Sequence, residues 1–105
     1  MRFEIVLAPQ AAQDLRALPA RRRSEVRDAV ETRHEPTKVS KSRIKRLRGM
    51  AKPQYRLRVG ETRVFYDVRD ETVEILAIVA KRQAQRWLAE QGTPESDGGA
   101  GEGEG

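Results

Sequence analysis

Three runs rich in apolar, strand-forming residues occupy the middle of the chain, at residues 55–59, 62–68 and 72–79, and alternation sorts the side chains of the first two runs onto two faces. Valine, isoleucine, leucine, tyrosine and phenylalanine supply most of their apolar positions, and short polar breaks separate them. Runs of this kind with turn residues between them are typical of consecutive antiparallel strands. The pattern therefore predicts a three-strand meander.

The break Gly60-Glu61 predicts a two-residue hairpin turn between the first two strands, because glycine readily adopts the positive φ that such a turn needs. With this turn closed tightly, Leu57 faces Val64 and Arg58 faces Arg63. Like charges placed opposite each other cost stability on a sheet. The arginine side of this hairpin therefore either is solvated or holds an anion.

An apolar segment and two helical patterns precede the meander. Residues 3–7 are short and apolar enough for a buried strand. Pro9 occupies a position at which a helix can begin, and apolar residues recur at helical spacing through residues 11–18 and 20–33. Because Pro19 divides the two patterns, they predict a helical hairpin with one apolar face.

A short helix and a polar tail follow the meander. Residues 83–91 predict the helix, and Gly92 is placed to cap its end. Residues 92–105 consist mostly of glycine, acidic and other polar residues, which predicts a disordered acidic tail. We therefore expect one α+β domain over residues 1–91: an N-terminal strand, a helical hairpin, the antiparallel meander and a short C-terminal helix.

The charge of the 105-residue chain is concentrated in this domain. The formal net charge is +5, but residues 92–105 hold four acidic residues and no basic one. The remaining body has 21 basic residues against 12 acidic ones, a formal charge of +9. A field this positive favours a nucleic acid as partner. The alternatives are a charge that serves solubility and a surface matched to an acidic protein.

A long basic connection spans residues 34–54. It contains Lys38, Lys41, Arg43, Lys45, Arg46, Arg48 and Lys52, and no acidic residue after Glu35. Charge runs usually belong to solvated, mobile loops. A positively charged loop beside a positive sheet face also suits phosphate binding. The chain segment can be both a solvated loop and a phosphate-binding one.

Several kinds of chemistry are excluded or unsupported. The chain has no cysteine, so it has neither disulfides nor thiolate metal ligands, which suits a reducing cytoplasm. No apolar run approaches the roughly 20 residues that span a bilayer. The single histidine, His34, excludes a two-histidine acid–base pair for RNA cleavage, and it is expected on the surface rather than at a metal. We expect neither a metal nor a cofactor.

Two aromatic residues are candidates for stacking on bases. Tyr66 shares a face with Val64 and Val68, so we expect it in the core. Trp87 either packs the last helix against the domain or lies at the edge of the basic face, where it would stack on a base.

Several spaced segments carry a family resemblance. Leu47-Arg48-Gly49, residues 55–66 and Ile78-Val79-Ala80-Lys81-Arg82 resemble the RelE/ParE toxin superfamily of bacterial toxin–antitoxin systems. The expected order of strands and helices is also similar to that family, over about residues 2–90. The resemblance implies the RelE-like fold and a toxin.

The superfamily implies two activities. RelE-like members enter the ribosomal A site and cleave mRNA there, with the 2′-hydroxyl attacking the adjacent phosphate and translation stopping as a result. Positions that resemble their catalytic set are Arg56, Arg58, Arg63 and Arg82. We expect RNA contacts from nearby basic residues and the tryptophan: Lys45, Arg46, Arg48, Lys52, Lys81, Arg86 and Trp87.

The chain departs from RelE at two points. Well-known RelE proteins carry lysines where this chain has Arg56 and Arg58, and a tyrosine in the last helix that this chain lacks. A guanidinium with a pKa above about 12 hardly gives up its proton, so these arginines are suited to clamping phosphate oxygens rather than to acting as a base. Lys81, Lys52 or ribosomal RNA would then assist proton transfer.

ParE-like members, the alternative, inhibit DNA gyrase by protein binding and break no phosphodiester. A purely structural interpretation also stays open, in which the three sheet arginines form surface ion pairs with Asp67, Asp70 or Glu74. In either toxin class we expect a RelB-like antitoxin as partner. Its acid-rich segment would lie over the basic surface or along the helical hairpin.

Overall fold

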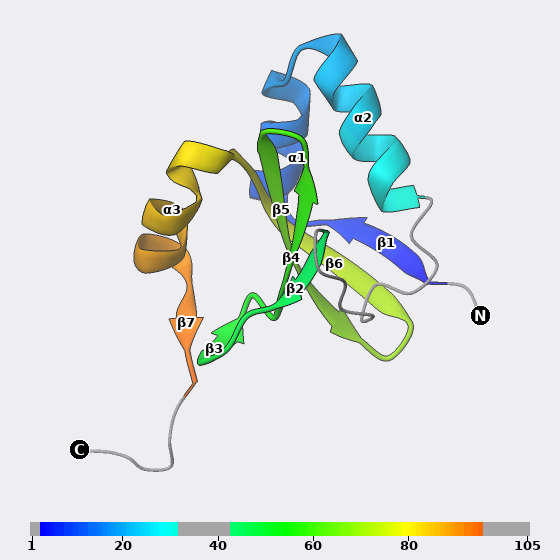
Figure 1. Ribbon diagram of the computed structural model, residues 1–105. Coiled ribbons are helices and arrows are strands. Elements are labelled where there is room, and N and C mark those ends of the chain that lie inside the picture. The colour runs from blue at the N-terminus through cyan, green and yellow to red at the C-terminus, as the bar shows by residue number, and fades with distance from the viewer. Residues whose placement is uncertain (1–2, 32–42, 96–105) are drawn as a thin grey trace.

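The computed structural model describes residues 3–31 and 43–95 (Figure 1). Its elements, in chain order, are β1 (Glu4–Leu7), α1 (Pro9–Ala17), α2 (Ala20–Glu31), β2 (Ile44–Arg46), β3 (Met50–Lys52), β4 (Tyr55–Val59), β5 (Thr62–Arg69), β6 (Thr72–Ala80), the 3₁₀ turn η1 (Lys81–Gln83), α3 (Ala84–Gln91) and β7 (Thr93–Pro94). The predicted α+β class is confirmed, and so is the order of strand, helical hairpin, meander and C-terminal helix.

The main sheet has five strands in the order β1-β6-β5-β4-β2. β4, β5 and β6 form the predicted antiparallel meander, β2 extends it beside β4, and β1 adds to β6 in parallel. A second sheet pairs β3 with β7. Figure 1 shows the helical hairpin α1–α2 and helix α3 on different sides of the β4–β5 hairpin.

The predicted register of this hairpin is confirmed. Leu57 faces Val64 and Arg58 faces Arg63. Gly60 has a φ of 58°, the left-handed value that the turn requires. The register could be predicted from the sequence because a two-residue turn leaves only one way to align the two strands.

Replacing Gly60 with alanine is expected to lower the free energy of unfolding by about 1 to 2 kcal/mol, the cost of placing a Cβ in left-handed backbone. A Cβ at this position meets no atom within 4 Å, so no steric clash is added. Urea unfolding measures the loss. Replacing the neighbouring, exposed Glu61 with alanine should stay within about 0.5 kcal/mol of the parent chain, and an equal loss in both variants would contradict the backbone explanation.

The main core lies between the α1–α2 hairpin and one face of the sheet. It contains buried side chains from both helices and from β2, β4, β5 and β6: Ala11, Val26, Ile44, Leu57, Val64, Tyr66, Val73, Ile75 and Ile78. Tyr66 is 4% exposed and its ring stacks on Tyr55 with centroids 5.4 Å apart, so the prediction that Tyr66 packs in the core is confirmed.

A smaller core covers the opposite face of the sheet. Phe65 and Ala77 face each other there and are both fully buried. The indole of Trp87 stacks on the Phe65 ring with centroids 4.9 Å apart and planes 8° from parallel. Of the two roles open to Trp87, the structure places it in the first: it packs α3 onto the sheet.

Several expectations were wrong in detail. The N-terminal strand β1 is exposed rather than buried, because it is an edge strand that neither helix fully covers. The connection 34–54 is not a continuous loop, since β2 and β3 lie within it. His34, Lys38 and Lys41 lie outside the described residues. None of the described helices has the length and apolar character needed to cross a membrane.

The tail also begins later than expected. Thr93 and Pro94 form β7, and the Glu95 N–H donates to the Gly49 carbonyl at 2.8 Å. Gly92 follows α3 as expected but in an extended conformation (φ −75°), and its N–H donates to the Leu88 carbonyl. A Cβ on Gly92 would collide with Met50 Cε and with the Leu88 carbonyl. Residues 96–105 lie outside the described part of the chain.

Candidate functional site

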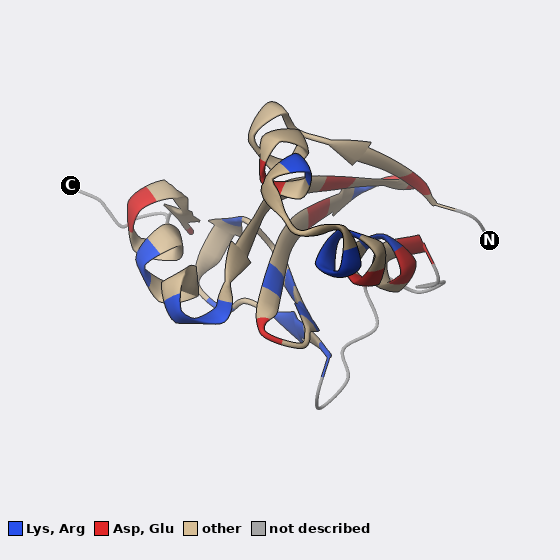
Figure 2. Cartoon of the chain, turned by 90° about the horizontal axis from the view of Figure 1, so that it is seen from above, with Lys and Arg blue, Asp and Glu red and all other residues tan. Residues whose placement is uncertain are grey.

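Four basic side chains share the sheet face that carries Phe65, and we call them the arginine face: Lys45, Arg56, Arg58 and Arg63. Lys45 on β2 faces Arg56 on β4, and Arg58 faces Arg63 on β5. Residues directly opposite each other on neighbouring strands point to the same side of a sheet. Figure 2 shows lysines and arginines on these strands and on the neighbouring helix α3.

Arg56 lies in the middle of this face and is only partly exposed. Burial lowers the pKa of its guanidinium, and the positive charges of Arg63 and Arg58 lower it further. Its Nε is buried and has no hydrogen-bond partner. An arginine remains charged under these conditions. The face therefore holds desolvated positive charge that an anion would compensate.

Arg63 is the most buried of the four, at 7% exposure. Its Nη1 donates to the Gly60 carbonyl at 2.8 Å and to the Thr62 carbonyl at 3.1 Å. The guanidinium is thus folded back onto its own hairpin, where it braces the turn. Arg63 is therefore a buried positive charge beneath the arginine face. Arg58, which faces it on β4, is exposed to solvent.

The structural interpretation of the arginines fails on this point. In the part of the chain that the structure describes, Arg56, Arg58 and Arg63 form no ion pair with a carboxylate. Asp67 instead accepts a hydrogen bond from the Gln54 N–H at 2.7 Å. The charges on the arginine face therefore lack the ordinary surface pairing.

The other predicted RNA-binding residues are dispersed around this face. Arg46 does not belong to it: its guanidinium lies over the Tyr55 ring, 5.4 Å from the centroid, and donates to the Leu47 and Gln54 carbonyls. Arg48 lies in the turn before β3, and Lys52 ends β3; both are exposed.

Lys81 and Arg82 occupy the exposed turn η1 beside the β4–β5 hairpin, and the Lys81 N–H donates to the Glu61 carbonyl at 2.8 Å. They line a hollow of about 340 Å³ together with Arg22 and Glu61. Arg86 is exposed on α3, one residue before Trp87.

Two basic residues that were not among the predicted RNA contacts lie near the site. The Arg43 carbonyl accepts from the Arg58 N–H at 2.8 Å, which continues the β2–β4 register and brings Arg43 beside Arg58. Arg22 enters the hollow at η1 from α2. The signal for Arg43 was its place in the basic connection 34–54. The approach of α2 to η1 is tertiary and left no signal in the local sequence.

Gln54 fastens the segment after β3 to the meander. Besides the bond from its N–H to Asp67, its side-chain oxygen accepts from the Val68 N–H at 2.9 Å. The Gln54 carbonyl accepts from the Leu47 N–H at 2.8 Å. These bonds fix the ends of the turn that carries Arg48 relative to the sheet.

Asp67 should make stability depend on pH. Burial raises the pKa of this carboxyl, and Glu74 raises it further, whereas the hydrogen bond from Gln54 and the charges of Lys52 and Arg69 act to lower it. With the folded pKa above the ordinary 3.8, the folded state binds more protons than the unfolded state between the two values. The contribution of Asp67 to the free energy of unfolding is therefore present below this window and is lost as the pH rises through it.

Replacing Asp67 with asparagine is expected to flatten this pH dependence, because the amide does not titrate and its oxygen still accepts from Gln54. Urea unfolding from about pH 3 to pH 7 measures the effect. Asp70→Asn removes a carboxyl from an exposed turn and is the control variant. A slope that is identical in Asp67→Asn and the parent would contradict the assignment.

In the described residues, no group of three or more histidine, cysteine, aspartate or glutamate side chains is placed to hold a metal ion. What the arrangement offers is positive charge and hydrogen-bond donors on a rigid sheet. It can bind and orient an anion, and it can stabilise negative charge that develops there.

Comparison with known proteins identifies the family. The sequence profile of the ParE toxins of type II toxin–antitoxin systems matches residues 5–85, more than three quarters of the chain. The chain belongs to this toxin family. The match confirms the predicted RelE/ParE superfamily and makes the chain a toxin of a type II toxin–antitoxin system. No curated protein sequence matches it.

Solved structures of other toxins resemble this ParE/RelE-type toxin. In the RelE–RelB complex of Pyrococcus horikoshii, the matching chain is 31% identical, with a TM-score of 0.57 over 77% of this chain and 97% of that one. In the RelBE2 toxin–antitoxin complex of Mycobacterium tuberculosis the identity is 27%, with a TM-score of 0.62 over 76% and 92%. The YoeB dimer of Staphylococcus aureus shares the fold. Its chain is 18% identical, with a TM-score of 0.55 over 75% of this chain and 97% of that one.

Proposed function

We propose that this toxin is a ribosome-dependent endoribonuclease that cleaves mRNA in the A site and thereby stops translation. The observation that carries the proposal is the arginine face, where Arg56, Arg58 and Arg63 share one side of the sheet and pair with no carboxylate of the described residues. A phosphodiester in its transition state gains negative charge, and fixed positive groups stabilise that charge most where water is partly excluded. The resemblance to RelE-like members of the superfamily, which cleave mRNA, supports an RNA substrate.

The chemistry follows from the donors that are present. The 2′-oxygen of the substrate forms a bond to the adjacent phosphorus, and the bond from phosphorus to the 5′-oxygen breaks. The 2′-hydroxyl loses one proton, and the leaving 5′-oxygen gains one. Arg56 and Arg58 would hold the non-bridging oxygens, with Arg63 adding charge from below and Arg82 approaching from η1. None of these guanidiniums accepts the proton, so Lys81, Lys52 or ribosomal RNA would take part in its transfer.

The role of Trp87 in this proposal is indirect. One face of its indole is occupied by Phe65. We therefore assign Trp87 to holding α3, with Arg86, beside the arginine face. Lys45 lies within the face, and Arg48 and Lys52 border it; all three would contact the RNA backbone at a distance from the reacting phosphate. Arg46 is engaged with Tyr55 and contributes mainly to the shape of the loop.

The proposed partners are the ribosome with its mRNA and a cognate antitoxin of the RelB type, which places the toxin in the cytoplasm. The similar structures from Pyrococcus horikoshii and Mycobacterium tuberculosis are complexes, of RelE with RelB and of the RelBE2 toxin with its antitoxin. An acid-rich antitoxin segment over the arginine face would neutralise it and exclude RNA at the same time. Binding should therefore weaken with salt.

Inhibition of DNA gyrase is the second candidate. It is favoured by the match to the ParE profile and by the absence of a tyrosine from α3. In that case the same charges would contact gyrase and no phosphodiester would be broken.

Primer extension on mRNA from cells that briefly express the toxin tests the proposal. We expect codon-phased cuts inside translated frames, which disappear in Arg58→Gln. Growth arrest with intact mRNA, together with loss of supercoiling by purified gyrase when the toxin is added, would overturn the nuclease and establish the second candidate.

A further inference from the structure

The two edges of the main sheet are built differently. At one edge, β2 exposes Lys45 and Arg46, charged side chains of the kind that protect an edge from pairing with another strand. At the other edge, β1 exposes Ile5, Val6 and Leu7, with 37%, 42% and 38% of each residue accessible. Among the described residues, no strand pairs with the outer side of β1.

The backbone of β1 has hydrogen-bonding groups on this outer side that no described strand pairs with. The Glu4 N–H donates to the Glu71 carbonyl and the Ala8 N–H donates to the Ile75 carbonyl, both on the β6 side. In a strand the backbone groups of successive residues point alternately to the two sides. The N–H and C=O groups of Ile5 and Leu7 therefore point away from β6, toward the open edge.

An apolar hollow adjoins β1 on the helix side of the sheet. Its volume is about 220 Å³, and seven of its nine lining residues are apolar, among them Ile5, Leu7 and Val26; the other two are Arg27 and Glu31 of α2. Side chains of a strand added beside β1 that point to this side would enter an apolar environment. Burial of such side chains is the main source of binding energy at a site of this kind.

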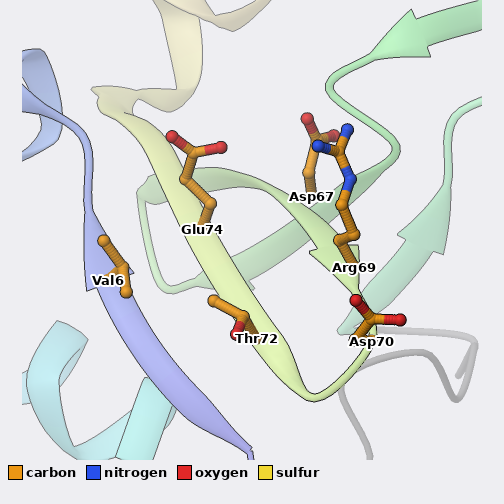
Figure 3. Close-up of a pocket in the computed structure, with 6 residues that line it drawn as sticks. All are labelled: Val6, Asp67, Arg69, Asp70, Thr72 and Glu74. Carbon is orange, nitrogen blue, oxygen red and sulfur yellow. The ribbon is translucent and has the colours of Figure 1, made fainter.

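An acidic hollow adjoins β1 on the other side of the sheet. Its volume is about 300 Å³, and Val6 lines it (Figure 3). The remaining lining residues come from β5, β6 and the turn between them: Asp67, Arg69, Asp70, Thr72 and Glu74. Three carboxylates against one guanidinium give it a negative charge. Figure 3 shows Glu74 on β6 between Val6 on β1 and Asp67 on β5.

We propose that the edge of β1 binds an extended segment of a partner protein in which apolar and basic residues alternate, added to the sheet as a further strand. Successive side chains of a strand point to opposite faces. Every second residue of the segment would therefore enter the apolar hollow beside Ile5 and Leu7, and the residues between them would reach the acidic hollow beside Val6. Backbone bonds to Ile5 and Leu7 supply the affinity, and the two hollows supply the choice of sequence.

A second copy of this chain does not meet this requirement. Pairing of β1 with its own copy would bring a second Glu4 to the side of Val6, because residues 4 and 6 share a face. That carboxylate would add to the negative charge of Asp67, Asp70 and Glu74. The requirement also differs from the acid-rich segment proposed for the arginine face, so the two surfaces can engage different parts of one partner or different partners.

A synthetic peptide tests the proposal on the full-length chain. The probe is Thr-Val-Lys-Val-Arg-Val-Thr with blocked ends, and its matched control has glutamate in place of lysine and arginine. We expect the basic peptide to bind at least about tenfold more tightly than the acidic one at 0.15 M salt, where the Debye length of about 8 Å limits the repulsion from the rest of the basic body.

Amide hydrogen exchange gives the direct structural readout. Bound peptide should slow exchange at the Ile5 and Leu7 amides, which face the open edge, and should leave the Val6 amide, which faces β6, nearly unchanged. A peptide that is N-methylated on the amides facing β1 should lose binding. Neither of these measurements requires a change in the protein.

A charge-reversal pair completes the test. Glu74→Lys should weaken binding of the basic peptide about tenfold. Glu25→Lys makes the same change of charge on the exposed surface of α2 and should leave the affinity for this peptide within about twofold of the parent chain. Equal binding of the acidic and basic peptides, unchanged exchange at Ile5 and Leu7, or protection of these amides by self-association alone would overturn the proposal.

Discussion

Replacing Arg58 with glutamine is expected to reduce mRNA cleavage by about two orders of magnitude and, at the same time, to raise the free energy of unfolding. Removal of one preorganised charge that stabilises a transition state typically costs about 10²- to 10³-fold in rate. Arg58 directly faces Arg63, so its removal also relieves a repulsion between like charges, worth up to about 1 kcal/mol across a strand pair. A residue that only supported the fold would lower both quantities together.

Cleavage in a purified translation system and urea unfolding of the same preparations measure the two effects. Arg27→Gln is the control, because it removes the same charge from the exposed surface of α2, away from the arginine face. It should leave cleavage within about threefold and stability within about 0.5 kcal/mol. Unchanged cleavage in Arg58→Gln would remove this residue from the catalytic set, and parallel losses in both measurements would make it structural.

Replacing Phe65 with alanine is expected to lower the free energy of unfolding by about 3 to 5 kcal/mol, the usual cost of deleting a buried aromatic ring. Phe65 is fully buried, and its ring is the platform for Trp87. The variant loses both the packing of the ring and the stacking that holds α3. For a domain whose total stability is on the order of 5 to 15 kcal/mol, this is a large fraction.

Urea unfolding followed by the fluorescence of Trp87 measures this loss, because the single tryptophan reports on its own environment. The native spectrum of Phe65→Ala should shift toward that of an exposed indole even before unfolding. Val6→Ala removes apolar atoms from an exposed position and should cost less than about 0.5 kcal/mol. A small loss in Phe65→Ala would mean that α3 is held by other contacts.

The meander and its register were predictable because they depend on local rules. Alternation along the strands assigned Leu57 and Val64 to one face of the sheet and Arg58 and Arg63 to the other. The turn at Gly60 then fixed the register of β4 and β5. The arginine face was therefore visible in the sequence as a set of residues on one side of a hairpin. The prediction that Tyr66 is in the core followed from the same alternation.

The features that were missed depend on tertiary contacts. Exposure of β1 follows from its place at the edge of the sheet, and a four-residue strand with three apolar residues carries no information about that place. The sequence identified Arg63 as a charged side chain, but it gave no sign that the guanidinium is buried and donates to the Gly60 and Thr62 carbonyls. The stacking of Trp87 on Phe65 likewise required the position of α3.

The parallel pairing of β1 with β6 has a consequence for the order in which the chain is assembled during synthesis. It joins residues 4–7 to residues 72–75, whereas the β4–β5 hairpin is closed by a two-residue turn. Local contacts form before distant ones, because closing a long loop costs more entropy. At about 5 to 20 residues per second, β6 follows β1 from the ribosome by roughly 3 to 14 seconds. The hairpin that carries Arg56, Arg58 and Arg63 can therefore form first, and the first strand to be synthesised is among the last to be placed in the sheet.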